Sequence, residues 1–169
     1  MVYPGGRIFE GSWEEDKREG EGFEMYSNGN IYEGNFTAGK AHGFGVYSWK
    51  NGEKYEGEWD SGKKCGFGIW TSKFIIFIFC LLDKRGEMYK GCWRDNKAEG
   101  KGEHIWATGD RYEGEWSQFL KHGYGVDYFF NGDKYEGEYK YGKPCGLGVY
   151  TWATGGTYTG QFVDGVKSG

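Results

Sequence analysis

The fold is decided by one stretch, Tyr55-Glu56-Gly57-Glu58-Trp59-Asp60-Ser61-Gly62-Lys63, because the same nine-residue pattern returns along the whole chain. Its copies lie 23 residues apart except for one interval of 34, and they begin at Phe9, Tyr32, Tyr55, Tyr89, Tyr112, Tyr135 and Tyr158. A fixed period of about 20 to 50 residues indicates an array in which each unit covers its neighbour. Residues 1–169 are therefore expected to form a single repeat array, with a partial unit from residue 158.

The composition predicts an all-β protein. The chain has 33 Gly, only 2 Pro and 20% aromatic residues, and this aromatic content argues against disorder. Tyr, Trp and Phe favour pleated sheets and bury large areas, whereas regularly spaced Gly marks turns, bulges or close backbone approach. We expect many short strands.

Charge and cysteine content narrow the classes of partner and compartment. The net charge of -4 gives no long-range attraction for nucleic acid, so a nucleic-acid partner is not expected. The four cysteines show no metal-ligand spacing, and no signal peptide opens the chain. A reducing cytoplasm without a disulfide framework is therefore the expected location.

Each unit is predicted to be one β-hairpin. Tyr32–Phe36 alternates, which places Tyr32, Gly34 and Phe36 on one face of a strand. Residues 37–42 are expected to form a turn, and Gly43–Trp49 forms the second strand. Residues 50–53 contain the Asn-Gly pair that is typical of tight hairpin turns.

Hairpins joined by short turns predict an elongated, twisted, single-layer antiparallel sheet. About 13 strands at roughly 4.8 Å per strand would give a sheet of about 60 Å. The sequence offers no helix or second sheet to cover it, so the aromatic rings are expected to lie over the sheet's own glycines.

The pattern Tyr-x-Gly-x-Trp-x-x-Gly-Lys-x-x-Gly-x-Gly, repeated every 23 residues, resembles the MORN repeat (membrane occupation and recognition nexus). The resemblance covers essentially the whole chain. It implies an elongated, twisted sheet of tandem β-hairpins. It also implies roles in scaffolding, protein binding and sometimes membrane tethering, often in cilia, junctions or the cortical cytoskeleton.

Three units depart from this pattern. Asp16 and Asn96 stand where Gly is expected, Phe119 replaces the turn Gly of the fifth unit, and Lys101 and Glu103 occupy positions that are usually apolar. These units are expected to serve only as spacers.

The 34-residue interval contains a hydrophobic insertion of eleven residues at about 73–83. Phe74–Leu82 contains no polar group except one thiol and is too short for a transmembrane helix, which needs about 20 residues. Three interpretations stay open. The segment is a translated intron of 33 nucleotides whose removal restores the 23-residue spacing, an ordered loop that covers the aromatic face, or a membrane-touching loop.

Aromatic residues form columns that are expected to stack and hold the sheet. A one-layer sheet cannot bury both faces, so part of this stripe should stay accessible as a groove for an extended peptide or a helix. The candidate groove residues are Tyr32, Phe36, Trp49, Tyr55, Trp59, Tyr89, Trp93, Trp106, Tyr112, Trp116, Phe129, Tyr135, Tyr139 and Trp152.

Lysines recur at one turn position and would line one long edge of the sheet. On a membrane they would face phosphoinositide head groups, and otherwise they are solvated turn residues that keep the sheet soluble. A column of glutamates offsets much of their charge. The candidate lipid-facing residues are Lys17, Lys40, Lys63, Lys97 and Lys143.

No catalytic, metal or cofactor site is expected. One position of the repeat holds His, Cys or Glu in turn, which suits an exposed turn residue better than a metal ligand or a base. No phosphate-binding loop or nucleophile motif appears. The residues at this position are Glu19, His42, Cys65, Glu99, His122 and Cys145.

Together these features predict a non-enzymatic scaffold that presents an aromatic groove to a protein partner, in a ciliary or cortical cytoskeletal assembly. The alternatives are a module that tethers membranes through phosphoinositides, and the accessory region of a larger lipid kinase or methyltransferase. Because both termini cut through a unit, the chain is expected to be a piece of a longer array or to associate end to end.

Overall fold

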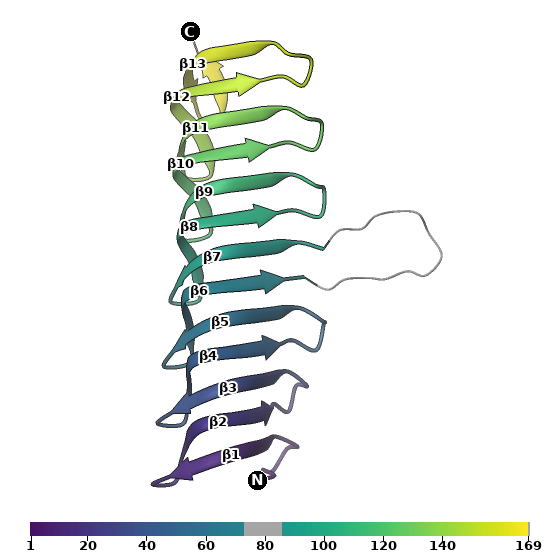
Figure 1. Ribbon diagram of the computed structural model, residues 1–169, viewed down its shortest axis with the longest axis vertical. Coiled ribbons are helices and arrows are strands. Elements are labelled where there is room, and N and C mark those ends of the chain that lie inside the picture. The colour runs from purple at the N-terminus through teal and green to yellow at the C-terminus, as the bar shows by residue number, and fades with distance from the viewer. Residues whose placement is uncertain (73–85, 169) are drawn as a thin grey trace, which may run out of the picture.

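The computed structural model describes residues 1–72 and 86–168, which form one antiparallel sheet with its strands in sequence order (Figure 1). The prediction of an all-β, single-layer array of hairpins is confirmed, with 14 strands instead of about 13. The strands are β1 (Ile8–Glu14), β2 (Lys17–Met25), β3 (Ile31–Thr37), β4 (Lys40–Ser48), β5 (Lys54–Asp60), β6 (Lys63–Thr71), β7 (Met88–Arg94), β8 (Lys97–Ile105), β9 (Arg111–Ser117), β10 (Leu120–Tyr128), β11 (Lys134–Lys140), β12 (Lys143–Thr151), β13 (Thr157–Val163) and β14 (Val166–Ser168). The hydrophobic insertion lies outside the described residues.

The turn inside each hairpin is shorter than predicted. Thr37 pairs with Lys40, so the connection between β3 and β4 is the two residues Ala38 and Gly39 and not the whole of 37–42. Both residues have positive φ, 49° and 81°. This is the conformation of a type I′ turn, whose twist matches that of the flanking strands.

The departures from the repeat pattern leave this turn intact. Asp16, Asn96 and Phe119 occupy the Gly position with φ of 60°, 69° and 68°. Asp and Asn tolerate the left-handed region, whereas a bulky side chain rarely adopts it. Phe119 therefore holds a strained backbone.

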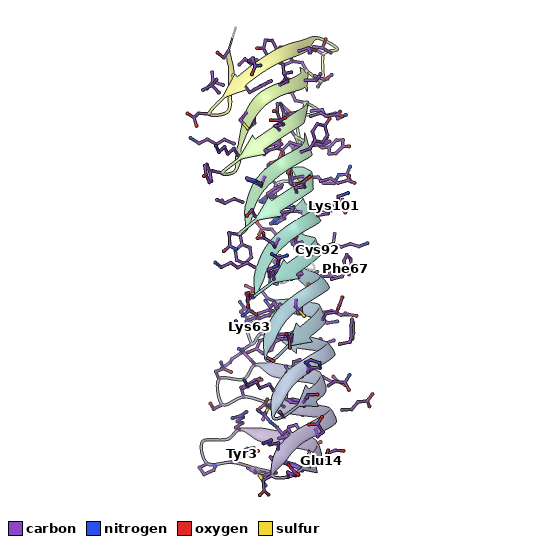
Figure 2. All side chains as sticks on the ribbon, turned by 90° about the vertical axis from the view of Figure 1, so that its left-hand side faces the viewer. Tyr3, Glu14, Lys63, Phe67, Cys92 and Lys101 are labelled. Atoms are coloured by element: carbon purple, nitrogen blue, oxygen red, sulfur yellow. The ribbon has the colours of Figure 1, made fainter. Side chains whose placement is uncertain are left out.

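A β-bulge bends six of the hairpins. In the β5–β6 pair, Gly57 faces Gly68 but Glu58 faces Cys65, which leaves Gly66 and Phe67 as extra residues in β6. The carboxylate of Glu58 accepts a hydrogen bond of 2.8 Å from the backbone N–H of Phe67 and so holds the bulge. Bulges increase local twist and bend strands, and Figure 2 shows strands that curve across the width of the sheet.

The core consists of aromatic rings that lie over glycines of the same sheet. Tyr55 is fully buried, and a Cβ added at Gly68 would lie 2.6 Å from its ring. Its hydroxyl donates to the carbonyl of Glu58 at 3.1 Å. Tyr55 also packs edge-on against Trp59 and Trp93, with ring centroids 5.2 Å apart in both pairs. The same contacts link neighbouring hairpins into a ladder of T-shaped ring pairs.

Candidate functional site

One face of the sheet carries all the predicted groove residues, and we call it the aromatic face. The first two columns are almost completely buried, at 0 to 7% exposure. Trp59 also donates from its indole nitrogen to the carbonyl of Gly45 at 3.1 Å. These columns therefore build the sheet: Tyr32, Phe36, Tyr55, Trp59, Tyr89, Trp93, Tyr112, Trp116, Tyr135 and Tyr139.

The remaining predicted groove residues stay accessible. Trp49, Trp106 and Phe129 are partly exposed, and Trp152 is 37% exposed. They lie where the second strand of each hairpin runs into the loop that leads to the next hairpin. A ligand that contacts the aromatic face would meet these rings first.

Sequence reasoning missed a neighbouring row on the same face. Tyr47, Trp70 and Tyr150 are half-buried and pair across the strands with tyrosines of the first column, as Trp70 does with Tyr55 and Tyr89. Residues two apart in a strand lie on the same face, so the position of Trp49 would have placed Tyr47 on this face as well.

Cations on the aromatic face were also missed. Lys64 lies over the rings of Trp49 and Tyr55, with its nitrogen 4.5 Å and 4.9 Å from their centroids. Lys121 has the same position over Tyr112, at 4.8 Å. Lys64 and Lys121 are each the second residue of a strand whose first residue faces away from the rings. Strand alternation would therefore have placed both lysine side chains on the aromatic face.

A hollow of about 410 Å³ opens on the aromatic face beside Lys64. Asn96 and Phe119 are among the residues that line it, so the fourth and fifth units, expected to be spacers, contribute to this surface. Trp49 and Trp70, both partly exposed, line it as well. The hollow is therefore open to solvent and mainly aromatic.

His104 lies in this hollow and is kept neutral. Its ring stacks on Trp106 with centroids 4.3 Å apart and planes 8° apart. Burial, reinforced by the charge of Lys121, lowers the pKa of His104 to about 4. In the described residues its Nε2 atom is buried and has no hydrogen-bond partner.

The neutral state of His104 makes stability depend on pH. The unfolded state binds a proton near pH 6.5 and the folded state only near pH 4, so stability falls as pH drops through this window. We expect the wild type to lose about 2 to 3 kcal/mol more than a His104→Tyr variant between pH 7 and 4. Urea unfolding at both pH values measures this difference, and equal losses would contradict it.

The opposite face, which we call the charged face, carries the predicted lysine edge. All five lysines are exposed, and two of them pair with aspartates: Lys63 with Asp95 at 2.7 Å, and Lys143 with Asp164 at 3.8 Å. Asp95 lowers the effective positive charge of this edge and, through its hydrogen bond, raises the pKa of Lys63. The edge is therefore only partly available for anionic head groups.

The charged face also has a shallow hollow of about 610 Å³ over the glycine rows of β7 to β10. In Figure 2 the labelled Phe67 and Lys101, which line it, lie on one side of the ribbon. Nearby charges pair within the face, as Arg111 does with Glu103 at 2.9 Å. This ion pair neutralises the carboxylate of Glu103, which lines the hollow.

Metal-ligating groups do not gather in the described part of the chain, where no three His, Cys, Asp or Glu residues form a cluster. Cys65, Cys92 and Cys145 have free thiols. Across residues 1–72 and 86–168, no helix is long and apolar enough to span a membrane.

Comparison with solved structures places the fold among known open sheets. The chain is similar to the SAS-4 (dCPAP) TCP domain of Drosophila melanogaster, solved in complex with a proline-rich motif of Ana2 (dSTIL). The TM-score is 0.52 and the identity 12%, over 96% of this chain and 82% of that domain. At this identity the likeness shows the fold alone. No curated protein matches the chain.

The sequence profile of the MORN repeat matches seven segments along the chain. They are residues 9–31, 32–54, 55–73, 89–111, 112–134, 135–157 and 158–169. Each full match begins at a buried first-column aromatic residue and spans one hairpin with its following loop. The chain therefore belongs to the MORN-repeat family.

Proposed function

We propose that this protein is a non-enzymatic scaffold that binds an extended peptide or a helix of a protein partner on its aromatic face. The observation that carries the proposal is the set of partly exposed rings, Trp49, Trp70, Trp106, Phe129 and Trp152, on a face that no second layer of the described residues covers. Large aromatic side chains that are partly desolvated are the residues that most often dominate protein interfaces.

Two further facts support the proposal. The similar TCP domain was solved with a proline-rich motif, so an open sheet of this kind can hold a peptide. The MORN repeat is a module that recurs without catalytic residues of its own, and a ciliary or cortical cytoskeletal assembly is the setting that we propose.

The test removes accessible rings and leaves the buried columns in place. Trp59 and Trp116 are 7% and 6% exposed, so their loss would weaken the sheet itself. We expect Trp49→Ala with Trp106→Ala to lower affinity for a captured partner at least tenfold while the β-sheet circular dichroism is kept. Partners are captured by a photo-cross-linking residue that replaces the exposed Ala107, beside Trp106, in the full chain.

The matched control lies on the charged face. Phe44 and Phe67 are 55% and 48% exposed, and their replacement by Ala removes two rings without touching the aromatic face. Affinity should stay unchanged in this control. If the control loses binding and the Trp variant keeps it, the partner binds the charged face and the proposal is wrong.

A second candidate function, membrane tethering through the lysine edge, rests on the exposure of Lys17, Lys40 and Lys97. Co-sedimentation with vesicles that contain phosphoinositide, at low and high salt, separates it from protein binding. Salt-sensitive binding that Lys17→Glu, Lys40→Glu and Lys97→Glu together abolish would support tethering.

A further inference from the structure

The aromatic face carries a pattern with twice the period of the hairpin. The second residue of each second strand alternates between a cation and a small residue: Arg18, Ala41, Lys64, Ala98, Lys121, Pro144 and Lys167. At roughly 4.8 Å per strand, the cations are about 20 Å apart, beyond the screening length at physiological salt. Lys64 and Lys121 therefore each have a small residue at this position in the hairpins on both sides.

Two of these cations have a carboxylate of their own. Arg18 pairs with Glu24 at 2.6 Å and Lys121 with Asp127 at 2.7 Å, and in both cases the carboxylate comes six residues after the cation. The residue six positions after Lys64 is Trp70. Unlike Arg18 and Lys121, Lys64 has no carboxylate within ion-pair distance among the described residues.

Aromatic rings surround Lys64 in place of a counter-ion. Its nitrogen is 4.5 Å, 4.9 Å and 5.1 Å from the ring centroids of Trp49, Tyr55 and Trp93. This environment lowers the pKa of Lys64 to about 8 through burial, although the charge of Glu53 opposes the shift. An ammonium group so placed still has N–H donors that the rings do not satisfy as an oxygen would.

The hollow beside Lys64 has a second unsatisfied polar group. His104 lines the same hollow, and its buried Nε2 atom lacks a hydrogen-bond partner among the described residues. Phe119, at another part of the lining, keeps a backbone conformation that a bulky residue rarely adopts. Strained residues and unsatisfied polar atoms concentrate at binding sites, where the structure is shaped for a ligand.

We propose that this hollow binds a carboxylate side chain of an acidic and apolar peptide segment, with the ammonium group of Lys64 as its ion-pair partner. The inference rests on the proposed protein-binding function and specifies the chemistry of the partner. The rings of Trp49, Trp70 and Trp93 would contact the apolar side chains beside the carboxylate. His104 can donate a second hydrogen bond when its Nε2 carries the proton.

Other chemistries fit the hollow less well. A basic side chain would leave the N–H donors of Lys64 without an acceptor, and a purely apolar one would bury two polar groups without partners. Glu53 and Glu87 also line the hollow, and Glu53 accepts a hydrogen bond of 3.4 Å from Trp70. They would repel a run of acidic residues, so a single carboxylate between apolar side chains is the expected motif.

Three small probes with the same phenylalkyl body and similar length test the chemistry on the full chain. We expect 4-phenylbutyrate to bind at least tenfold more tightly than 4-phenylbutylamine or 4-phenylbutanol, measured by nuclear magnetic resonance of the indole N–H signals. Lys64→Met, which keeps the aliphatic stem, should abolish the preference, and Lys64→Arg should retain it. Lys63→Met removes the same charge from the neighbouring residue on the charged face and should change nothing.

Equal binding of the three probes, tighter binding of the amine, or an unchanged preference in Lys64→Met would overturn the inference. Twelve-residue peptides selected by display on the full chain then separate this inference from the proposed function. Peptides that need Trp49 and Trp106, but carry no acidic residue and bind Lys64→Met normally, would leave the groove standing and remove the carboxylate site. Peptides that bind without Trp49, Trp106 and Lys64 would contradict both the aromatic groove and the carboxylate site.

Discussion

Replacing Gly57 by Ala will lower the free energy of unfolding by about 3 kcal/mol or more, because the new methyl group has no space. A Cβ at this position would lie 2.5 Å from the Cα of Gly68, and 2.7 Å from both the carbonyl oxygen of Phe67 and the hydroxyl of Tyr55. Two of these atoms are backbone, so the strands β5 and β6 must separate. Urea unfolding monitored by tryptophan fluorescence measures the loss.

Gly62→Ala is the matched control for this prediction. A Cβ at Gly62 meets nothing within 4 Å, but its φ of +83° is unfavourable for a side chain. The control should therefore lower the free energy of unfolding by about 1 to 2 kcal/mol, because only the left-handed conformation opposes the new side chain. If the two substitutions lowered the free energy of unfolding equally, crowding of the new methyl group against the Tyr55 ring and the backbone would not explain the loss at Gly57.

The second large effect is expected at Asp127, one of two buried carboxylates among the described residues. It is 6% exposed and accepts hydrogen bonds from Lys121 at 2.7 Å and from the hydroxyl of Tyr139 at 2.6 Å. Burial and the neighbouring carboxylate together raise the pKa of Tyr139 far above its usual value, so this phenol stays a donor. Asp127→Ala should cost about 3 kcal/mol, because it leaves a half-buried ammonium group without its partner.

In another hairpin of the chain, two uncharged residues stand in place of the Lys121–Asp127 ion pair. Ala41 and Tyr47 occupy the equivalent two positions in the second hairpin. We therefore expect Lys121→Ala combined with Asp127→Tyr to recover most of the stability that Asp127→Ala loses, as measured by a double-mutant cycle. If the double variant is as unstable as Asp127→Ala, the ion pair has a role that an aromatic residue cannot replace.

The spacing of glycine and aromatic residues was sufficient to predict the sheet. The first-column tyrosine and the glycine two residues later lie on one face of a strand, and only a glycine leaves space for the ring, as at Gly57 beneath Tyr55. The two-residue turn was harder to predict, because Lys40 and Ala41 are polar or small and resemble turn residues although they pair with β3.

The candidate site was predicted only in part. The sequence indicated Trp49 and Trp106, which stay accessible, together with ten columnar residues that prove to be buried. Exposure within a single layer depends on how far the bulges bend each strand, and the 23-residue period contains no information on this. Lys64 was missed because a lysine beside a turn normally extends into solvent.

The residue type at one position of the hairpin repeats in a fixed order along the chain. Glu19, His42 and Cys65 return in the same order as Glu99, His122 and Cys145, each 80 residues later. The two glutamates make the same contact, accepting the turn N–H of Ala38 at 2.9 Å and that of Gln118 at 3.0 Å. This position of the repeat therefore follows a cycle of three hairpins, and the glutamate that begins each cycle makes the same turn contact.

Among the described residues, every strand of the sheet pairs only with the strands that precede and follow it in the chain. No contact has to wait for a distant part of the polypeptide, so we expect the protein to gain structure while it is still being synthesised. Each newly completed hairpin would dock on the one before it, and a ribosome paused anywhere in the message would hold a shorter but properly paired sheet.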